Sequence, residues 1–359
     1  MLNQQNYPRK FGIEITNTFN NFYETHLNSL IKSEKDNDFV TRINIISPSF
    51  ISIFNSEISK NPQFSEKNQY FLHNEFRNKE NFLIVNLNLE REYLHEIIVN
   101  MLKDEQINSV DYSVSFFKLQ DINIINEKHR RVLIEWLSNS SAKWQPNDET
   151  LFHSINIIDR YITKKKITLE KFQLVGIASY FIAAKYEHMN IQFLDDLVIS
   201  CKNIYSHKDI IKMEYEILSS LNFDICFISS YKFLAYFYFF GEFNNKKLFY
   251  LSQLILEICT LSIEIMAVSQ SKRAVCSLLI AKKCLQIQGG NDENLLNISN
   301  ISDFEIKEIQ KKIILFLNFI ITRDKTNFIL EKFSHYKYMK VSDVFIRKKE
   351  TECDPLFYY

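Results

Sequence analysis

The sequence has few residues that turn or break a chain. Five glycines and five prolines are spread over 359 residues. Sheets with many tight turns, and proline-rich linkers, need more of both. The scarcity therefore favours helices joined by polar loops. With 46% apolar residues, a chain of this length can form two domains with hydrophobic cores.

An excess of charge of either sign is also missing. Forty-three basic residues balance 43 acidic ones, so bulk electrostatics indicate no nucleic-acid partner. The longest apolar stretches are interrupted by charges before the ~20 residues that a bilayer span needs. The first residues, MLNQQNYPRK, lack the apolar core of a secretory signal. We therefore expect no membrane partner and a location in nucleus and cytoplasm.

Motifs of catalysis and metal binding are absent as well. None of the six cysteines forms a CxxC pair, and several lie among apolar residues, which favours buried thiols in a reducing compartment. The sequence contains no HExxH, no glycine-rich phosphate loop and no GxSxG. We predict no catalytic residue, no metal site and no cofactor.

Periodicity divides the chain into a weakly patterned leader and a helical remainder. Residues 1–88 are rich in Asn, Ser and Phe and poorly periodic, which predicts a partly disordered leader. From Glu90 to about Gln106 the pattern becomes helical. Its predicted apolar face consists of Leu94, Ile97, Ile98 and Leu102. A connector to residue 126 follows.

Five helical segments follow the connector. They are predicted at about 127–143, from Asn147 after Pro146, from Thr168 to about Glu187, at 193–201, and from Ser206. Asn147 and the Ser206-x-x-Asp209 motif are capping signals. The third segment is apolar almost all round and rich in small residues, so we expect the other helices to pack around it.

A weak internal repeat predicts a second copy of this unit. The tetrapeptide Ile182-Ala183-Ala184-Lys185 is echoed by Ile280-Ala281-Lys282-Lys283 about 98 residues later. The second copy is expected at about 229–332, with Gly289-Gly290 in a surface loop. The predicted fold class is all-α, with two tandem five-helix units.

The order of sequence blocks resembles the cyclin family. The blocks RRVLIEWL, IDRYI, FQLVGIASYFIAAKYEH and MEYEILSSLNFD, between Arg130 and Asp224, resemble the N-terminal cyclin box of A/B-type (mitotic) cyclins. The tail EKFSHYKYMKVS resembles their C-terminal end. The likeness covers about 90–345. It implies two tandem cyclin boxes preceded by an N-terminal helix, with these divisions: leader 1–88, helix and connector 89–126, boxes 127–228 and 229–335, tail 336–359.

The resemblance implies a regulatory subunit that binds and activates a cyclin-dependent serine/threonine kinase in mitosis or at G2/M. Lys185 and Glu214 match the pair that engages the kinase in cyclins. Apolar contacts beside them are expected from Ile182, Tyr186, Leu218 and Phe223. The structural alternative is a snorkelling lysine and a solvated glutamate. At Asp159-Arg160, another family match, we favour an intramolecular ion pair that secures the leader or a loop.

The resemblance also implies a shallow groove for Arg-x-Leu peptides of substrates and inhibitors. Its residues here are Val132, Leu133, Trp136, Phe172 and Gln173. The family's usual first residue is replaced by His129, and its two acids by Asn139 and Lys202. These replacements remove the charge-assisted bonds that an arginine seeks. The alternative is plain packing of a Trp-bearing helix.

Degradation signals are the last feature of the resemblance. Lys79-Glu80-Asn81 spells a KEN box, which implies recognition by the ubiquitin ligase of mitotic exit. The same letters arise by chance in a chain rich in Lys and Asn. A near match to a destruction box at Arg91-x-x-Leu94 falls inside the predicted helix, which favours a structural role.

Two other functions remain open from the sequence. A cyclin-fold module without a kinase, as in general transcription factors, would bind polypeptide or DNA, and a purely structural helical scaffold would bind no kinase. The balanced charge argues against the DNA version. Lys185 and Glu214 are the residues that discriminate among these functions.

Overall fold

The computed structural model describes residues 93–107, 109–113, 116–121, 125–144, 147–187, 194–323 and 327–345. The predicted leader with Lys79-Glu80-Asn81 lies outside these residues, as do Arg91 and the end of the predicted tail.

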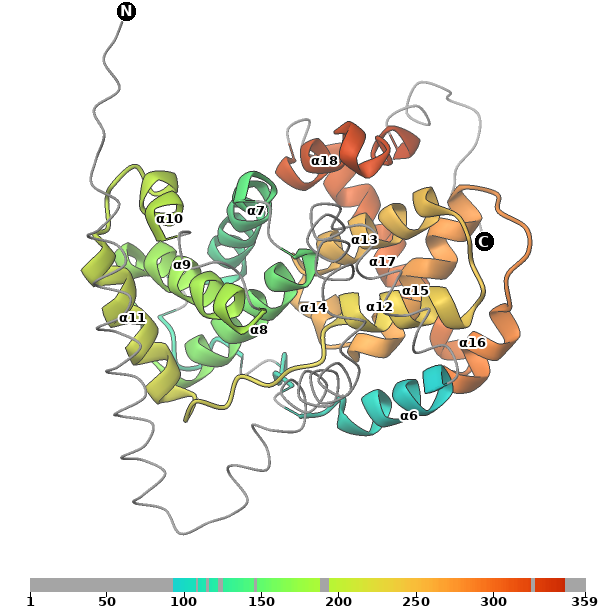
Figure 1. Cartoon of the computed structure of the whole chain (residues 1–359), viewed down its shortest axis with the longest axis horizontal. Helices are drawn as coiled ribbons and strands as arrows, with labels where there is room; N and C mark the ends of the chain where they lie inside the picture. The colour runs from blue at the N-terminus through green and yellow to red at the C-terminus, as the bar shows by residue number, and fades with distance from the viewer. Residues whose placement is uncertain are drawn as a thin grey trace, which may run out of the picture. The chain divides into compact units, whose positions relative to one another are not determined.

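The described residues form helices and no strands, which confirms the all-α class (Figure 1). The helices are α6 (Leu94–Asp104), α7 (Glu127–Trp144), α8 (Asp148–Lys164), α9 (Leu169–Tyr186), α10 (Leu194–Ser200), α11 (His207–Ser220), α12 (Ser230–Phe240), α13 (Lys246–Cys259), α14 (Ile263–Met266), α15 (Gln270–Cys284), α16 (Asp292–Ser299), α17 (Asp303–Arg323), α18 (Phe328–Phe333) and the 3₁₀ turn η4 (Tyr336–Tyr338).

Helix α9 is the centre of the first bundle, as its all-round apolar sequence predicts. Every residue from Leu174 to Ala184 is buried, and the helix packs against α7, α8 and α11. Its small residues allow close approach. A Cβ added at Gly176 would lie only 2.7 Å from Leu133 Cδ1 of α7, so any side chain at this position would force the Leu133 side chain to move.

Helix α15 is the centre of the second bundle. It packs against α12, α13, α16 and α17, and the stretch from Ala274 to Leu278 is buried. Lys282 and Lys283 lie in its last turn, as Lys185 does in α9. The two helices whose sequences echo each other therefore hold corresponding places in their bundles. The fold consists of two tandem helical units, as predicted, and the second unit has the short helix α14 in addition to α12, α13, α15, α16 and α17.

The predicted helix starts are confirmed. The Asn147 side chain accepts a hydrogen bond from the Glu149 amide at 3.3 Å, and α8 begins there. At α11, the Asp209 amide donates to Ser206 Oγ while the Asp209 carboxylate accepts from the Ser206 amide. These reciprocal bonds form a capping box, which satisfies amides that have no partner inside the helix.

Helix α6 differs in part from the prediction. It ends at Asp104 and buries Leu94, Ile98 and Met101, whereas the predicted Ile97 and Leu102 are only half-buried. It packs against α12 and α16 of the second bundle. The residues of α6 that are buried are therefore those on the side facing α12 and α16, and not all of those on its predicted apolar face.

Glu105 fixes the end of α6 to the second bundle. Its carboxylate is buried and accepts hydrogen bonds from the Ser271 amide at 2.6 Å and the Ser271 hydroxyl at 2.9 Å. Ser271 lies in the first turn of α15, where free amides and the helix dipole favour an anion. The helix that precedes the first bundle therefore caps the central helix of the second.

A buried ion pair joins four segments of the chain. Arg130 of α7 donates to both carboxylate oxygens of Asp159 of α8 at 2.7 Å, and neither side chain is exposed. Arg130 also donates to the Thr260 carbonyl oxygen, just after α13, at 2.7 Å. The Tyr112 hydroxyl of the connector donates to Asp159 at 2.6 Å. The expected intramolecular ion pair thus forms between Asp159 and Arg130, and not with Arg160.

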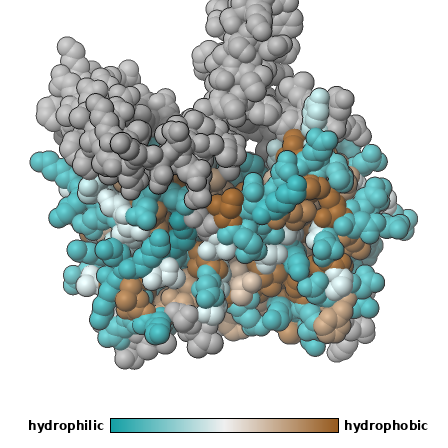
Figure 2. Space-filling model, turned by 90° about the horizontal axis from the view of Figure 1, so that it is seen from below, coloured by the Kyte–Doolittle hydropathy of each residue, from teal (hydrophilic) through white to brown (hydrophobic). Residues whose placement is uncertain are grey.

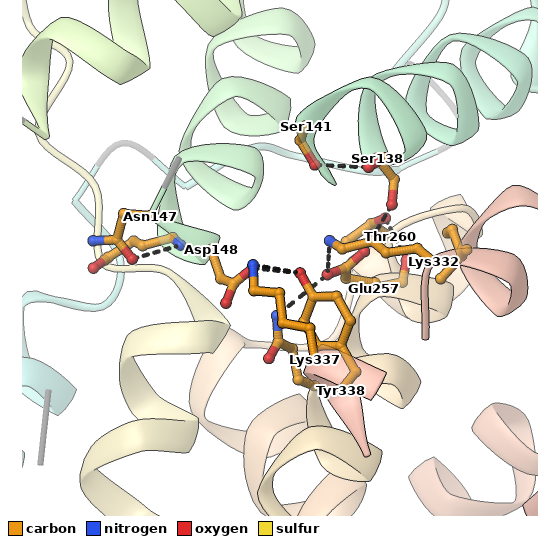
Figure 3. A network of polar contacts seen from close by, with 12 residues as sticks. Ser138, Ser141, Asn147, Asp148, Glu257, Thr260, Lys332, Lys337 and Tyr338 are labelled. Carbon is orange, nitrogen blue, oxygen red and sulfur yellow. Dashed lines mark hydrogen bonds and ion pairs between the residues drawn. The ribbon is translucent and has the colours of Figure 1, made fainter. Parts of the chain in front are cut away.

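A second buried ion pair links α7, α13 and α18 (Figure 3). Lys332 Nζ lies 2.6 Å from Glu257 Oε1, and Ser138 Oγ donates to the other oxygen at 2.8 Å. Beside it, the Tyr338 hydroxyl of η4 donates to Asp148 at the start of α8 at 3.3 Å. The chain after α17 therefore contacts the first bundle as well as the second.

The uncovered part of the face seen in Figure 2 mixes polar and apolar side chains. Among the described residues, no helix is both long and apolar enough to cross a bilayer.

We predict that Asp159→Asn destabilises the fold by about 3–5 kcal/mol, because it leaves the buried Arg130 guanidinium without a charged partner. Urea unfolding followed by circular dichroism measures this loss. The control is Lys312→Met at the exposed Lys312–Glu264 pair, whose atoms are 3.0 Å apart. That change should cost less than about 1 kcal/mol. Equal losses would contradict the role assigned to the buried pair.

Candidate functional site

Lys185 and Glu214 meet where α9 ends beside α11. Their side chains form an ion pair. The lysine side chain is 29% exposed and the glutamate side chain only 1%. Lys185 Nζ also lies 4.3 Å from the centre of the Phe181 ring, within range of a cation–π interaction. The structure therefore excludes the solvated glutamate of the structural alternative and brings the predicted pair together.

Burial dominates the electrostatics of this pair. It raises the pKa of Glu214, and the attraction of Lys185 offsets only part of that effect. The cause is that a low-polarity environment disfavours a carboxylate more than one nearby cation favours it. Lys185 is thus the only part of the pair that a partner can reach directly.

Tyr186 lies beside the pair and packs against a buried histidine. Its ring meets the His153 ring edge to face, with centroids 4.7 Å apart. His153 Nε2 lies 2.6 Å from the Ile225 carbonyl oxygen, and Nδ1 lies 3.4 Å from Glu187. Burial raises the pKa of the Tyr186 hydroxyl. These contacts fix the half-exposed tyrosine at the end of α9.

The other predicted contact residues divide into buried and accessible ones. Ile182 and Leu218 are 3% and 7% exposed, so they hold α9 against α11 and offer little surface. Phe223 is half-exposed and has a positive φ of 56°. Its amide donates to the Leu218 carbonyl oxygen at 2.8 Å, which closes the end of α11. Tyr215 of α11, 39% exposed, was not among the predicted residues because it lies off the apolar stripe.

The predicted groove residues occupy one region of α7 and α9. Val132 is 61% exposed, Gln173 is half-exposed, and Leu133 and Phe172 are buried. Trp136 is half-buried, because its ring packs edge to face against the Trp144 ring, with centroids 6.4 Å apart.

The end of α10 and the loop after it add surface that the sequence did not predict. Trp144 Nε1 donates to Ser200 Oγ at 2.9 Å, which places the end of α10 beside the two tryptophans. Ile199 and Ile204 are each 65% exposed. Lys202, in place of an acid, is exposed with a φ of 55°. A groove here presents apolar groups and a cation, and no carboxylate at this position.

No group of three His, Cys, Asp or Glu side chains in the described part of the chain is placed to hold a metal ion. The thiols of Cys201, Cys259, Cys276 and Cys284 are buried, and Cys226 is half-buried. Burial raises the pKa of the Cys201 thiol to about 11, which disfavours a reactive thiolate.

Comparison with known families accounts for this architecture. Residues 96–226 match the description "Cyclin, N-terminal domain", and residues 228–345 match "Cyclin, C-terminal domain". The chain belongs to the cyclin family. The junction between the two matched regions falls between α11 and α12, where one helical unit ends and the next begins.

The similar proteins include B-type cyclins. Cyclin-B2-2 of Oryza sativa subsp. indica is 33% identical over 191 residues, which are 53% of this chain and 44% of that protein. G2/mitotic-specific cyclin-4 of Saccharomyces cerevisiae is 40% identical over 116 residues, 32% of this chain and 25% of that protein. The chain thus matches less than half the length of these relatives.

A solved structure shows the same fold. The viral cyclin from herpesvirus saimiri aligns with a TM-score of 0.56 at 18% identity, over 62% of this chain and 96% of the viral one. The tandem arrangement of the two helical units is therefore shared with a solved cyclin.

We predict that Glu214→Gln changes the pH dependence of stability. The folded protein retains the Glu214 proton above the usual pKa near 4.3, whereas the unfolded chain loses it. The stability of the wild type relative to the variant should therefore fall as pH rises from about 4.3 to the folded pKa, by at most about 1.4 kcal/mol per pH unit. Urea unfolding between pH 3 and 8 measures the difference.

Glu305→Gln is the matched control for this measurement. A hydrogen bond from Lys272 lowers the pKa of Glu305, so its contribution has the opposite sign and is lost as pH falls below the usual value. If the difference in stability between the wild type and Glu214→Gln does not change with pH, the raised pKa of Glu214 is contradicted.

Proposed function

We propose that this cyclin binds and activates a cyclin-dependent serine/threonine kinase during cell-cycle progression, in mitosis or at G2/M. It catalyses no reaction itself. The observation that carries the proposal is the Lys185–Glu214 pair, which holds a half-exposed cation at a fixed place between α9 and α11. Half-exposed Tyr186 follows Lys185 in the chain, and half-exposed Phe223 lies at the end of α11. Membership of the cyclin family and the likeness to B-type cyclins support the choice of partner.

The proposed mechanism is selection of an active kinase conformation. Lys185 donates to acceptors around the kinase αC helix, and the aromatic residues beside it bury apolar surface against that helix. Binding that favours the inward position of αC allows the kinase's own Lys–Glu pair to form and frees its activation loop. An activator needs only this difference in affinity between two conformations.

A cyclin-fold module that binds other proteins without a kinase is the second candidate. Such a module would also present a helical surface, but binding proteins other than a kinase does not require a lysine held by a buried carboxylate. Because ion pairs of this kind cost desolvation energy, the Lys185–Glu214 pair favours the kinase partner. We further propose nuclear and cytoplasmic location, as for a cell-cycle regulator.

The groove on α7 and α9 is proposed as a weak docking site for peptides of substrates or inhibitors. Half-buried Trp136 and exposed Val132 offer an apolar anchor. With Asn139 and Lys202 in place of acids, it should bind the leucine of an Arg-x-Leu peptide and gain little from the arginine. Recognition of Lys79-Glu80-Asn81 by the ubiquitin ligase of mitotic exit stays a prediction, since those residues lie outside the described part of the chain.

We predict that Lys185→Ala or Glu214→Ala abolishes co-purified kinase activity and leaves the helical circular dichroism intact. The expected loss exceeds tenfold, because a charge-assisted hydrogen bond contributes about 1.5–3 kcal/mol. Kinase assays on affinity-purified chain measure it. Full activity in both variants would refute the proposed function.

A double variant separates binding from folding. Lys185→Met with Glu214→Leu replaces the pair by apolar groups of similar size, which is often neutral or stabilising. We expect stability near that of the wild type and no kinase activity. Lys272→Met, which removes a partly exposed lysine of α15, is the control that keeps kinase activity.

For the groove, we predict that Arg-x-Leu and Ala-x-Leu peptides bind with affinities within about tenfold of each other, since no carboxylate replaces the two lost acids. Trp136→Ala should weaken both peptides equally, and Asn139→Glu should restore a preference for arginine. Fluorescence titration of the purified chain measures these affinities. Absence of binding by either peptide would leave plain packing as the role of Trp136.

A further inference from the structure

A cavity of about 100 Å³ lies where the connector after α6, helix α8 and the start of α15 meet. A single buried water needs only about 10–15 Å³ on the same measure, so several waters or a small polyatomic ion fit. None of the residues that line the cavity belongs to the Lys185–Glu214 site or to the groove on α7 and α9. It is therefore a separate feature of the molecule.

Arg273 is the only charged side chain among the described residues that line this cavity. The residue is 2% exposed, and its Nε has no hydrogen-bond partner. Its Nη1 contacts the sulfur of Met266, which is a weak acceptor. Because arginine keeps its proton in proteins, a buried guanidinium without an anion is unfavourable.

The carboxylates of this region already have partners. Glu105 accepts two hydrogen bonds from Ser271, and Asp159 is held by Arg130 and Tyr112. None of the ion pairs found among the described residues includes Arg273. Among the described residues, Arg273 is thus a buried cation with no carboxylate paired to it.

Three of the other polar residues of the wall can donate hydrogen bonds to an anion. Ser230 and Ser269 bring hydroxyl groups, and Gln270 brings a side-chain amide. Gln270 is also the first residue of α15, whose positive dipole end faces this region. A guanidinium with such donors around it is the usual protein environment of a phosphoryl or similar oxyanion.

We propose that this cavity binds a small oxyanion, of which inorganic phosphate is the simplest example, with Arg273 as its charged ligand. The bound ion would contact the connector, the first box and the second box at once. It would therefore stabilise the arrangement of the two boxes, independently of any kinase. The proposal does not depend on the proposed function.

The test is the melting temperature of the full chain at constant ionic strength, with phosphate exchanged for chloride. Phosphate should raise it saturably in the wild type, since a ligand that binds only the folded state stabilises it. Arg273→Met should weaken the apparent affinity at least tenfold. The matched control, Lys272→Met on the same helix, removes a cation that pairs with Glu305 and should respond like the wild type.

Two results would overturn the proposal. One is a wild type that responds equally to phosphate and chloride, and the other is an unchanged phosphate response in Arg273→Met. If Arg273→Met does not fold, calorimetry on Ser230→Ala with Ser269→Ala replaces it. A several-fold loss of affinity then supports the site, and no loss refutes it. The same measurement with a phosphoserine peptide in place of phosphate shows whether the cavity takes a free ion or a phosphoryl group carried by a partner.

Discussion

The described arrangement of helices depends on one interaction, the buried ion pair between Arg130 and Asp159. The Arg130 guanidinium, in α7, donates to Asp159 of α8 and to the Thr260 carbonyl oxygen beyond α13. The Tyr112 hydroxyl donates a further hydrogen bond to the Asp159 carboxylate. An arginine cannot become neutral to escape burial. The arrangement is therefore favourable only when the connector, the first box and the second box are all in register. We infer that this requirement fixes the two boxes relative to each other.

The candidate docking site depends on the same framework through α9. The central helix is held on several sides, and Gly176 lets α7 approach it closely. Its last turn can then place Lys185 against the buried Glu214 with little freedom to move. A side chain held in this way loses little entropy when a partner binds it. Rigidity in the core thus serves recognition at the surface.

Much of the secondary structure could be predicted from short stretches of the sequence. The apolar stretch from Leu174 to Ala184 indicated a central helix, and the caps at Asn147 and Ser206 lie where their sequences indicated. These features depend on neighbours a few residues away. The pairing of Lys185 with Glu214 came only from the resemblance to cyclins, since no spacing rule joins residues on separate helices. The partial cover of Trp136 by Trp144 likewise depends on the folded arrangement and not on a local motif.

The sequence by itself determined the helices, their caps, the duplication and the family. Each of these depends on periodicity or on short motifs, which are written along the chain. Only the tertiary structure decided that Glu105 caps α15 across 166 residues and that Arg130 reaches Thr260 across 130. The same holds for Arg273, whose place in the wall of a cavity no local motif of α15 predicts. Burial changes the energy of a charge, and burial is a property of the folded chain alone.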